Sequence, residues 1–140
     1  MKQSKDQLKD VRILVVEDEK DSREIVQFVL EQSGAAVVAV ESFKEAIEAY
    51  QQIEPNIVVA DIAMPDYNGY ALIARIREED RDRGKLTPAI ALTAFSGDAD
   101  QKTALSAGFQ EYMSKPFDPA ELIATIARLV GPGGSWSSAA

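Results

Sequence analysis

The chain alternates short apolar runs with longer amphipathic segments, and it does so five times. The apolar runs are rich in β-branched residues and have no polar face, which is typical of strands buried on both sides of a parallel sheet. Strict alternation of such strands with helices predicts an α/β fold, a parallel sheet covered by helices on both faces. The expected strands lie at residues 11–16, 37–40, 57–60, 89–92 and 112–114.

The segments between the strands repeat apolar residues at helical spacing and end at Gly or Pro. The predicted helices are residues 21–32, a segment from Ser42 to the break at Pro55, residues 71–83, residues 98–107 and a segment from Asp118 to Gly131. Ser42-Phe43-Lys44-Glu45 has the sequence of a capping box. In the first helix, the spacing predicts an apolar face made of Ile25, Phe28, Val29 and Gln32.

The chain has 140 residues, of which 46% are hydrophobic, enough for one domain with its own core. We expect that domain at residues 10–131, after a charged lead-in at 1–9. Residues 132–140 are rich in Ser and Gly, and we expect them to be a disordered tail or a cloning remnant. Cys and His are both absent, which excludes disulfides, thiolate or imidazole zinc sites and Ser/His/Asp catalysis.

The net charge is −8, and the excess of acidic residues lies within residues 1–80. Nucleic acids and anionic lipids bind cationic surfaces, so neither is an expected direct partner, whereas a cation or a basic partner surface is. The first ten residues lack the apolar core of a signal peptide, and no apolar run is long enough to span a bilayer. We therefore predict a cytoplasmic location without membrane insertion.

Polar side chains follow four of the five predicted strands. Glu17-Asp18 follows the first strand, Asp61 the third, Thr93 the fourth and Lys115 the fifth. In an open parallel sheet, ligands bind beyond the carboxyl ends of the strands, so these residues should meet at one edge. Each has an ordinary alternative role taken singly. Asp61 could form a turn, and Glu17-Asp18 could complement a helix N-terminus.

Together these residue types suit phosphoryl transfer. Three clustered carboxylates need a cation between them, and oxygen ligands without His or Cys favour Mg²⁺. A lysine can pair with a phosphoryl oxygen and a threonine hydroxyl can donate to one. An aspartate can act as the nucleophile and become an acyl phosphate.

The same residues resemble the receiver domain of bacterial two-component response regulators. The resemblance covers about residues 11–130, and it implies a flavodoxin-like doubly wound sheet of five strands in the order 2-1-3-4-5, with five helices. It is carried by Glu17-Asp18, by Asp61-Ile62-Ala63-Met64-Pro65-Asp66-Tyr67-Asn68-Gly69, by Leu92-Thr93-Ala94 and by Lys115-Pro116-Phe117.

The resemblance implies a phosphoacceptor and a metal site. Asp61 would be the phosphorylated residue. Asp18 and Asp61 would bind Mg²⁺, or Mn²⁺ in its place, directly, and Glu17 would bind it through water. The backbone carbonyl of Ala63 would complete the protein ligands.

The resemblance also implies a conformational switch. Lys115 would pair with Asp61 and then with the phosphoryl group. Thr93 would turn to bond the phosphoryl oxygen, and Tyr112 would follow it inward. An aromatic residue in a short edge strand can also be simply part of the core, so Tyr112 carries two interpretations.

The implied donor is a phosphohistidine on a histidine kinase or on a histidine phosphotransfer protein, since this chain has no His. Such a domain is not an enzyme toward other substrates and acts as a monomer or weak dimer. The segments at residues 8–18 and 89–94 resemble receivers of hybrid histidine kinases, and a stand-alone regulator is the alternative. A DNA-binding output is not expected in this chain, because only a short segment rich in Ser and Gly follows the last helix.

Three alternative functions fit these residues less well. A phosphohydrolase of the haloacid dehalogenase class would need a second acid where Ala63 stands, and a dinucleotide-binding domain would need G-x-G-x-x-G after the first strand. A receiver-like domain that only binds partners would lack the acceptor or the lysine, and both are present. Ala63 and Phe95 offer no polar side chain to orient water, so we predict a long-lived aspartyl phosphate.

Overall fold

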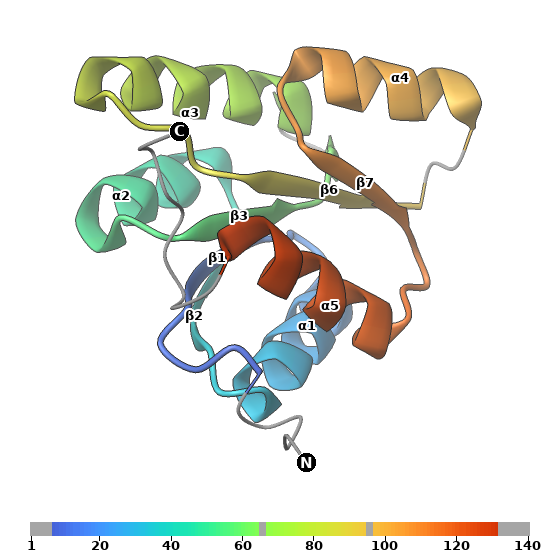
Figure 1. The fold of residues 1–140 in the computed structure, drawn as a ribbon. Helices are drawn as coiled ribbons and strands as arrows, with labels where there is room; N and C mark the ends of the chain where they lie inside the picture. Colours follow the sequence, from blue (N-terminus) through green and yellow to red (C-terminus); the bar gives the residue numbers. More distant parts are fainter. Residues whose placement is uncertain (1–6, 65–66, 95–96, 132–140) are drawn as a thin grey trace.

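The structure is a computed structural model that describes residues 7–64, 67–94 and 97–131. A five-stranded sheet forms its centre, in the order β2-β1-β3-β6-β7, and every neighbouring pair is parallel (Figure 1). Numbered by their order along the chain, these strands give 2-1-3-4-5, which confirms the predicted flavodoxin-like topology. The strands are β1 (Arg12–Val16), β2 (Ala36–Val40), β3 (Ile57–Ala60), β6 (Ala89–Thr93) and β7 (Glu111–Ser114).

Five helices cover the two faces of this sheet, as predicted. One face is covered by α1 and α5, and the other by α2, α3 and α4 (Figure 1). The helices are α1 (Lys20–Gln32), α2 (Phe43–Ile53), α3 (Gly69–Arg83), α4 (Asp98–Ala107) and α5 (Pro119–Val130).

The two layers of helices define two apolar clusters, one on each side of the sheet. Successive side chains of a strand point to opposite faces, so β1 supplies both clusters. Ile13 and Val15 lie in the cluster under α1 and α5, and Leu14 and Val16 lie in the cluster under α2, α3 and α4. This double burial explains why the strand sequences contain no alternation of polar and apolar residues.

Helix starts follow the predicted capping chemistry. The Ser42 hydroxyl accepts from the Glu45 N–H at 3.2 Å and caps α2. The reciprocal bond of the capping box differs from the prediction, because the Glu45 carboxylate accepts from the N–H of Glu41 at 3.1 Å. Asp118 caps α5 by accepting from the Ala120 N–H at 2.9 Å.

The predicted apolar face of α1 is wrong in part. Ile25 is 56% exposed and Phe28 is 62% exposed, whereas Val26 and Leu30 are buried. A helix can bury one stripe, and the apolar residues of α1 extend around more of its circumference than that stripe. The sheet selects the i, i+4 row that contains Val26 and Leu30, Val29 packs against the same cluster in part, and Ile25 and Phe28 face solvent.

A short antiparallel pair after β3 was not predicted. The segment β4 (Ala63–Met64) pairs with β5 (Tyr67–Asn68) where the sequence indicated only a turn. Gly69 follows β5 and brings the chain back to the residue before β4, because its N–H donates to the Ile62 carbonyl at 2.9 Å. A Cβ on Gly69 would lie 2.6 Å from the Ile62 Cα, so only glycine allows α3 to begin this close to the residue after Asp61.

The packed part of the chain begins before residue 10. Leu8, in the predicted lead-in, is completely buried, and its N–H donates to the Ser33 carbonyl at 2.7 Å. The first six residues and the predicted tail at 132–140 lie outside the described residues. Among the helices of the described ranges, none has both the length and the apolar character needed to cross a membrane.

Candidate functional site

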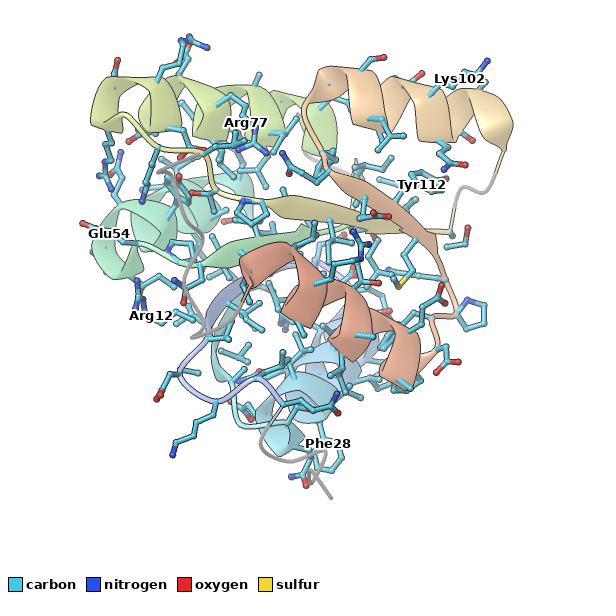
Figure 2. All side chains as sticks on the ribbon, in the orientation of Figure 1. Arg12, Phe28, Glu54, Arg77, Lys102 and Tyr112 are labelled. Atoms are coloured by element: carbon cyan, nitrogen blue, oxygen red, sulfur yellow. The ribbon has the colours of Figure 1, made fainter. Side chains whose placement is uncertain are left out.

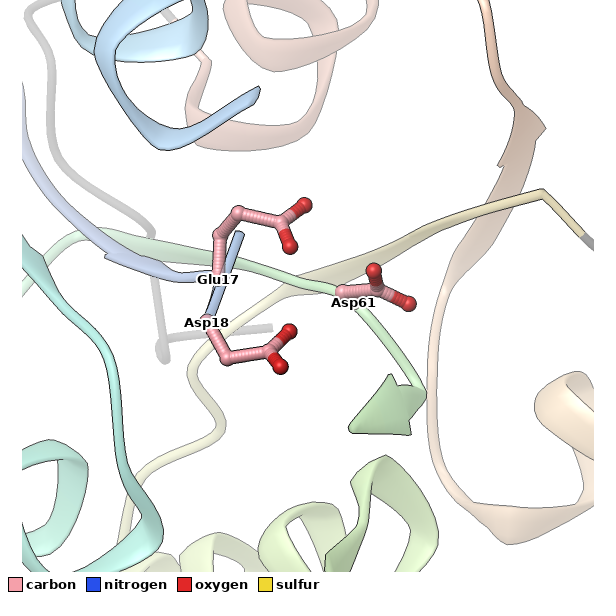
Figure 3. A group of neighbouring side chains, drawn as sticks. All are labelled: Glu17, Asp18 and Asp61. Carbon is pink, nitrogen blue, oxygen red and sulfur yellow. The ribbon is translucent and has the colours of Figure 1, made fainter. Parts of the chain in front are cut away.

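The carboxyl ends of the two central strands bring three carboxylates together. β1 and β3 are neighbours, with Val16 paired to Ala60, and the Asp61 N–H donates to the Val16 carbonyl at 2.9 Å. The residues that follow these strands are Glu17-Asp18 and Asp61, so their side chains emerge side by side (Figure 3). One carboxylate oxygen from each of the three lies within 4.8 Å of the others.

Two of these carboxylates are poorly solvated, and Asp18 is half-buried. Glu17 is 2% exposed and Asp61 is 7% exposed. Burial, followed by the charge of Asp61, raises the pKa of Glu17 above its ordinary value, although its hydrogen bond to Lys115 opposes that rise. The three acids therefore carry an electrostatic cost that a positive charge must offset.

Lys115 supplies part of that positive charge, and it does so at two carboxylates. Its Nζ lies 2.9 Å from Asp61 Oδ2, as the family resemblance implied, and 2.5 Å from Glu17 Oε1, a pairing that was not predicted. Burial alone would lower the pKa of Lys115, but its hydrogen bonds and charge interactions with Glu17 and Asp61 together raise it. Lys115 is thus held as an ammonium between the two acids.

The Asp61 carboxylate is oriented on both oxygens. Oδ1 accepts from the Ala63 N–H at 2.8 Å, and Oδ2 accepts from Lys115. The bond from the Ala63 N–H requires the chain to turn sharply after Asp61, where the antiparallel β4–β5 pair begins. The side chain of Ala63 itself is exposed and apolar, beside the Asp61 carboxylate.

Arg23 of α1 anchors the turn that contains Glu17 and Asp18, and this role was not predicted. Its Nη1 donates to the backbone carbonyls of Glu17 and Asp18, at 3.1 and 3.3 Å, and lies 3.5 Å from a carboxylate oxygen of Glu41. The only available signal was an arginine in the first helix, one turn beyond the acidic pair. Its partners are mainly backbone atoms, which a residue pattern does not reveal.

The structure also places Thr93, one of the two predicted switch residues, at this edge, and Tyr112 on the neighbouring strand β7. Thr93, the last residue of β6, is fully buried, and its carbonyl accepts from the Lys115 N–H at 2.7 Å. Tyr112 pairs with Ala91 in the β6–β7 register and is partly buried against the cluster under α2, α3 and α4. Phe95, used in the prediction of phosphate lifetime, lies outside the described residues.

The donor set suits a hard divalent cation. Three carboxylates face one ammonium in this cluster, so the group keeps an excess of negative charge. All the ligand atoms offered are oxygens, which fits Mg²⁺ or Mn²⁺ and does not favour zinc. The residues of the described chain therefore fit the predicted metal.

A flavodoxin-like sheet with an acidic trio, a threonine and a lysine at its carboxyl edge defines a two-component signalling domain. The comparisons with known proteins agree. The family model described as the response regulator receiver domain matches residues 13–127. The chain belongs to the family of response regulator receiver domains.

The chain matches nearly the whole length of one relative and about half the length of another. A 14.6 kDa protein of Leptolyngbya boryana is 42% identical over 119 residues, which are 85% of this chain and 89% of that protein. The phosphate regulon transcriptional regulatory protein PhoB of Escherichia coli is 37% identical over 115 residues, which are 82% of this chain and 49% of PhoB. The chain thus spans about half the length of PhoB.

A solved structure agrees with the fold. The non-phosphorylated HemR receiver domain from Leptospira biflexa has a TM-score of 0.74 and 30% sequence identity, and the match covers 85% of this chain and 93% of that one.

Proposed function

We propose that Asp61 accepts a phosphoryl group from a phosphohistidine and that the domain signals through the resulting change at Thr93 and Tyr112. The observation that supports this most directly is the position of Asp61. Its carboxylate lies between the acids that follow β1 and the ammonium of Lys115, and both of its oxygens are oriented. A turn-forming aspartate would need none of these neighbours.

The transfer exchanges one bond to phosphorus for another. An oxygen of Asp61 forms a P–O bond while the P–N bond of the phosphohistidine breaks, and the imidazole nitrogen leaves with the electron pair of that bond. The product is an acyl phosphate on Asp61 and a histidine that takes up a proton. Lys115, already beside Asp61 Oδ2, is placed to pair with the phosphoryl oxygens.

The predicted metal would be held by Asp18 and Asp61, by Glu17 through water and by the backbone carbonyl of Ala63. When bound, Mg²⁺ would neutralise charge on the phosphoryl oxygens. The residues of the chain hold the acids in place, through Arg23 on the backbone of Glu17 and Asp18 and through Lys115 on Glu17.

The proposed conformational switch involves Thr93, which a phosphoryl group on Asp61 would contact, and Tyr112 on the neighbouring strand. Thr93 ends the strand beside β3, so its hydroxyl is the predicted donor to a phosphoryl oxygen. Tyr112 lies next to this strand, on β7, and packs against the α2–α3–α4 cluster. A movement of Thr93 would change the packing available to Tyr112, and the populations of the two arrangements would shift.

An apolar groove beside Lys115 suits the donor. It has a volume of about 360 Å³ and is lined by α1 and by the segment after β7, including Ile25, Pro116 and Phe117. Lys115 also lines it, so a helical domain that seats apolar side chains there would bring its phosphohistidine close to Asp61. This accounts for the exposed Ile25, and it favours a kinase or phosphotransfer domain as partner, whether the receiver stands alone or is attached to a hybrid kinase. The location that goes with this function is the cytoplasm.

Mass spectrometry after incubation with acetyl phosphate and Mg²⁺ tests the proposal. We expect the mass of one phosphoryl group on the wild-type chain and none when EDTA is added. Asp61→Asn should gain nothing, and the control Asp82→Asn, at an exposed position of α3, should behave as the wild type. No gain in the wild type, or a gain that survives Asp61→Asn, contradicts the proposal.

A further inference from the structure

A second buried polar cluster lies far from Asp61, at the opposite edge of the sheet. It joins Tyr50 of α2, Asp80 of α3 and Thr87 of the α3–β6 loop, and all three are at least 97% buried. Asp80 accepts from the Tyr50 hydroxyl, and from the N–H and hydroxyl of Thr87 at 2.8 and 3.1 Å. The proposed phosphoryl transfer uses none of these groups.

Arg77 of α3 connects this cluster to the strands. Its Nη1 donates to Asp80 Oδ2 at 2.8 Å and to the Thr87 carbonyl at 2.7 Å. Its Nε and Nη2 both donate to the Gly108 carbonyl, at 3.2 and 2.7 Å, and Nη2 also donates to Gln110 Oε1 at 3.0 Å. An arginine has five N–H donors in a rigid fork, so all five are used here.

Two acceptors of Arg77, the Thr87 carbonyl and Gln110 Oε1, lie just before the two strands that carry the switch. Gln110 Oε1 also accepts from the N–H of Ala89, the first residue of β6, at 2.7 Å, and the Gln110 N–H donates to the Ala89 carbonyl at 2.9 Å. Gln110 directly precedes β7. Arg77 and Gln110 therefore hold the beginnings of β6 and β7 together, while Thr93 and Lys115 lie at their far ends.

The same contacts hold the end of α4. Gly108 follows α4 with a φ of 127°, and its carbonyl takes two N–H groups of Arg77. Figure 2 shows Arg77 on the α3 side of the sheet and Tyr112 on β7. The turn between α4 and β7 is thus attached to α3 and to β6 before the strand reaches Tyr112.

We infer that Arg77 is a positioning residue for the switch: it makes the α4–β7 turn a fixed pivot, so that movement begun at Thr93 appears at Tyr112 and α4 and is not lost by sliding of β7. This inference rests on the proposed function. If the turn were loose, β7 and α4 could shift as a whole when Thr93 moves, and Tyr112 would keep its surroundings. With the turn held, the start of β7 stays in place, so the Tyr112 side chain, two residues beyond Gln110, must rearrange in place of the whole strand.

The test uses two variants, Arg77→Met and the milder Gln110→Met. Gln110→Met leaves the Arg77–Asp80 pair intact, so it still tests the inference if Arg77→Met folds poorly. Arg75→Met is the matched control, because Arg75 lies on the same helix and its side chain is 42% exposed. Amide hydrogen exchange is measured on the unmodified chain. Backbone NMR shifts are then measured with and without acetyl phosphate and Mg²⁺, and uptake is followed by mass.

We expect amide exchange at Ala89 and Tyr112 to rise by about tenfold in both variants, because the bonds that hold the strand starts are lost. The phosphorylation-induced shift of the Tyr112 amide should fall to less than half of its wild-type size. Uptake of the phosphoryl group should stay within about twofold of wild type, since Arg77 is remote from Asp61. Arg75→Met should match wild type in all three measurements.

A purely structural role gives a different result. If Arg77→Met and Gln110→Met lower the melting temperature but leave the Tyr112 exchange rate and shift unchanged, the inference is overturned. A wild-type chain that takes up no phosphoryl group overturns the proposed function instead, and the exchange rates of the unmodified variants then still decide whether Arg77 holds the turn.

Discussion

At the scale of single residues, the positive charge of Lys115 offsets the negative charges of Glu17 and Asp61, which lie in one site. Its ammonium lies within 2.5 and 2.9 Å of Glu17 and Asp61, and the side chains of both acids are more than nine-tenths buried. Removing one member of such a cluster leaves buried charge without a partner, which costs more than the net value of the pair. The same ammonium also competes with any metal for those carboxylates.

The first prediction is that Lys115→Met lowers the free energy of unfolding by about 1–3 kcal/mol in EDTA. Because the competing ammonium is gone, added Mg²⁺ should raise the melting temperature of this variant more than that of the wild type. Thermal denaturation with and without Mg²⁺ measures both effects. Lys102→Met, at an exposed lysine of α4, is the control, and an equal or smaller Mg²⁺ effect in Lys115→Met would contradict the prediction.

A second prediction concerns pH. The pKa of Glu17 is raised in the folded chain by burial, so the folded state keeps its proton at pH values where the unfolded state has lost it. Without metal, stability should therefore fall as the pH rises from 4.5 through the raised pKa of Glu17. Mg²⁺ competes with that proton, so its stabilising effect should be larger at about pH 8 than at about pH 5.

Denaturant unfolding at several pH values, with EDTA or Mg²⁺, checks this second prediction. Glu17→Gln removes the titrating group and should flatten the metal-free profile in that interval. Glu24→Gln, at an exposed position of α1, should leave the profile unchanged. A metal-free profile that is the same in Glu17→Gln and wild type would show that another group is responsible.

A third prediction addresses the lifetime of the aspartyl phosphate. The Ala63 N–H is 2.8 Å from Asp61 Oδ1, and its exposed side chain carries no group that could orient a water. Ala63→Asn adds an amide there and should shorten the half-life of the phosphorylated chain several-fold. Phosphate release after removal of the donor gives the rate, and rapid release by the wild type that Ala63→Asn leaves unchanged would defeat the prediction.

At the scale of elements, the turn after β3 depends on one glycine. Gly69 lets α3 start against Ile62, where a Cβ would lie 2.6 Å from the Ile62 Cα. Since Ile62 joins Asp61 to Ala63, any displacement there moves the residue that orients the acceptor carboxylate.

The fourth prediction is that Gly69→Ala costs about 1–3 kcal/mol of stability, because the added methyl group forces the backbone of Ile62 to move. It should also slow phosphoryl uptake from acetyl phosphate. Denaturant unfolding and mass spectrometry measure the two effects. Gly97→Ala is the control, because the nearest atom to its added Cβ is an Asp100 carboxylate oxygen at 3.4 Å, and a loss as large as that of Gly69→Ala would remove the steric explanation.

Helix bounds that are set by capping and helix-breaking residues were predictable from the sequence. The choice of which helix face is buried was not, because it depends on the neighbouring elements. The bounds of α4 at 98–107 and the start of α5 after Asp118 follow from caps and breakers in the chain itself. The buried stripe of α1 was mispredicted because Ile25 and Phe28 fit the helical spacing as well as Val26 does. Only the sheet decides among them.

The same distinction holds for the site. The strand ends indicated which residues would meet, since parallel strands bring their carboxyl ends to one edge. The pairing of Lys115 with Glu17 was not predictable, because it depends on the length and rotamer of two side chains from distant strands. Arg23 and Arg77 were missed for a related reason: they bind largely backbone carbonyls, which have no sequence signature.

At the scale of the whole molecule, the core extends beyond the segment that carries the family motifs. The family model matches residues 13–127, yet Leu8, Val11, Leu129 and Val130 are buried in the cluster under α1 and α5. Leu8 is held there by its N–H bond to Ser33, at the end of α1.

The fifth prediction is that Leu8→Ala lowers the free energy of unfolding by about 2–5 kcal/mol, as expected for truncation of a fully buried leucine. Lys9→Ala, at the exposed neighbouring residue, should change it by less than about 0.5 kcal/mol. Denaturant unfolding of both variants gives the difference. Equal stabilities would mean that Leu8 contributes nothing to the core.

The buried Leu8 matters to anyone who transplants this receiver into a chimeric sensor. A junction placed at residue 13, where the recognisable motifs start, would discard a side chain that the interior needs and open a hole beneath α1 and α5. The graft would then report a weakened host instead of a signal. Junctions before Leu8 and after Val130 carry the complete interior into the new protein.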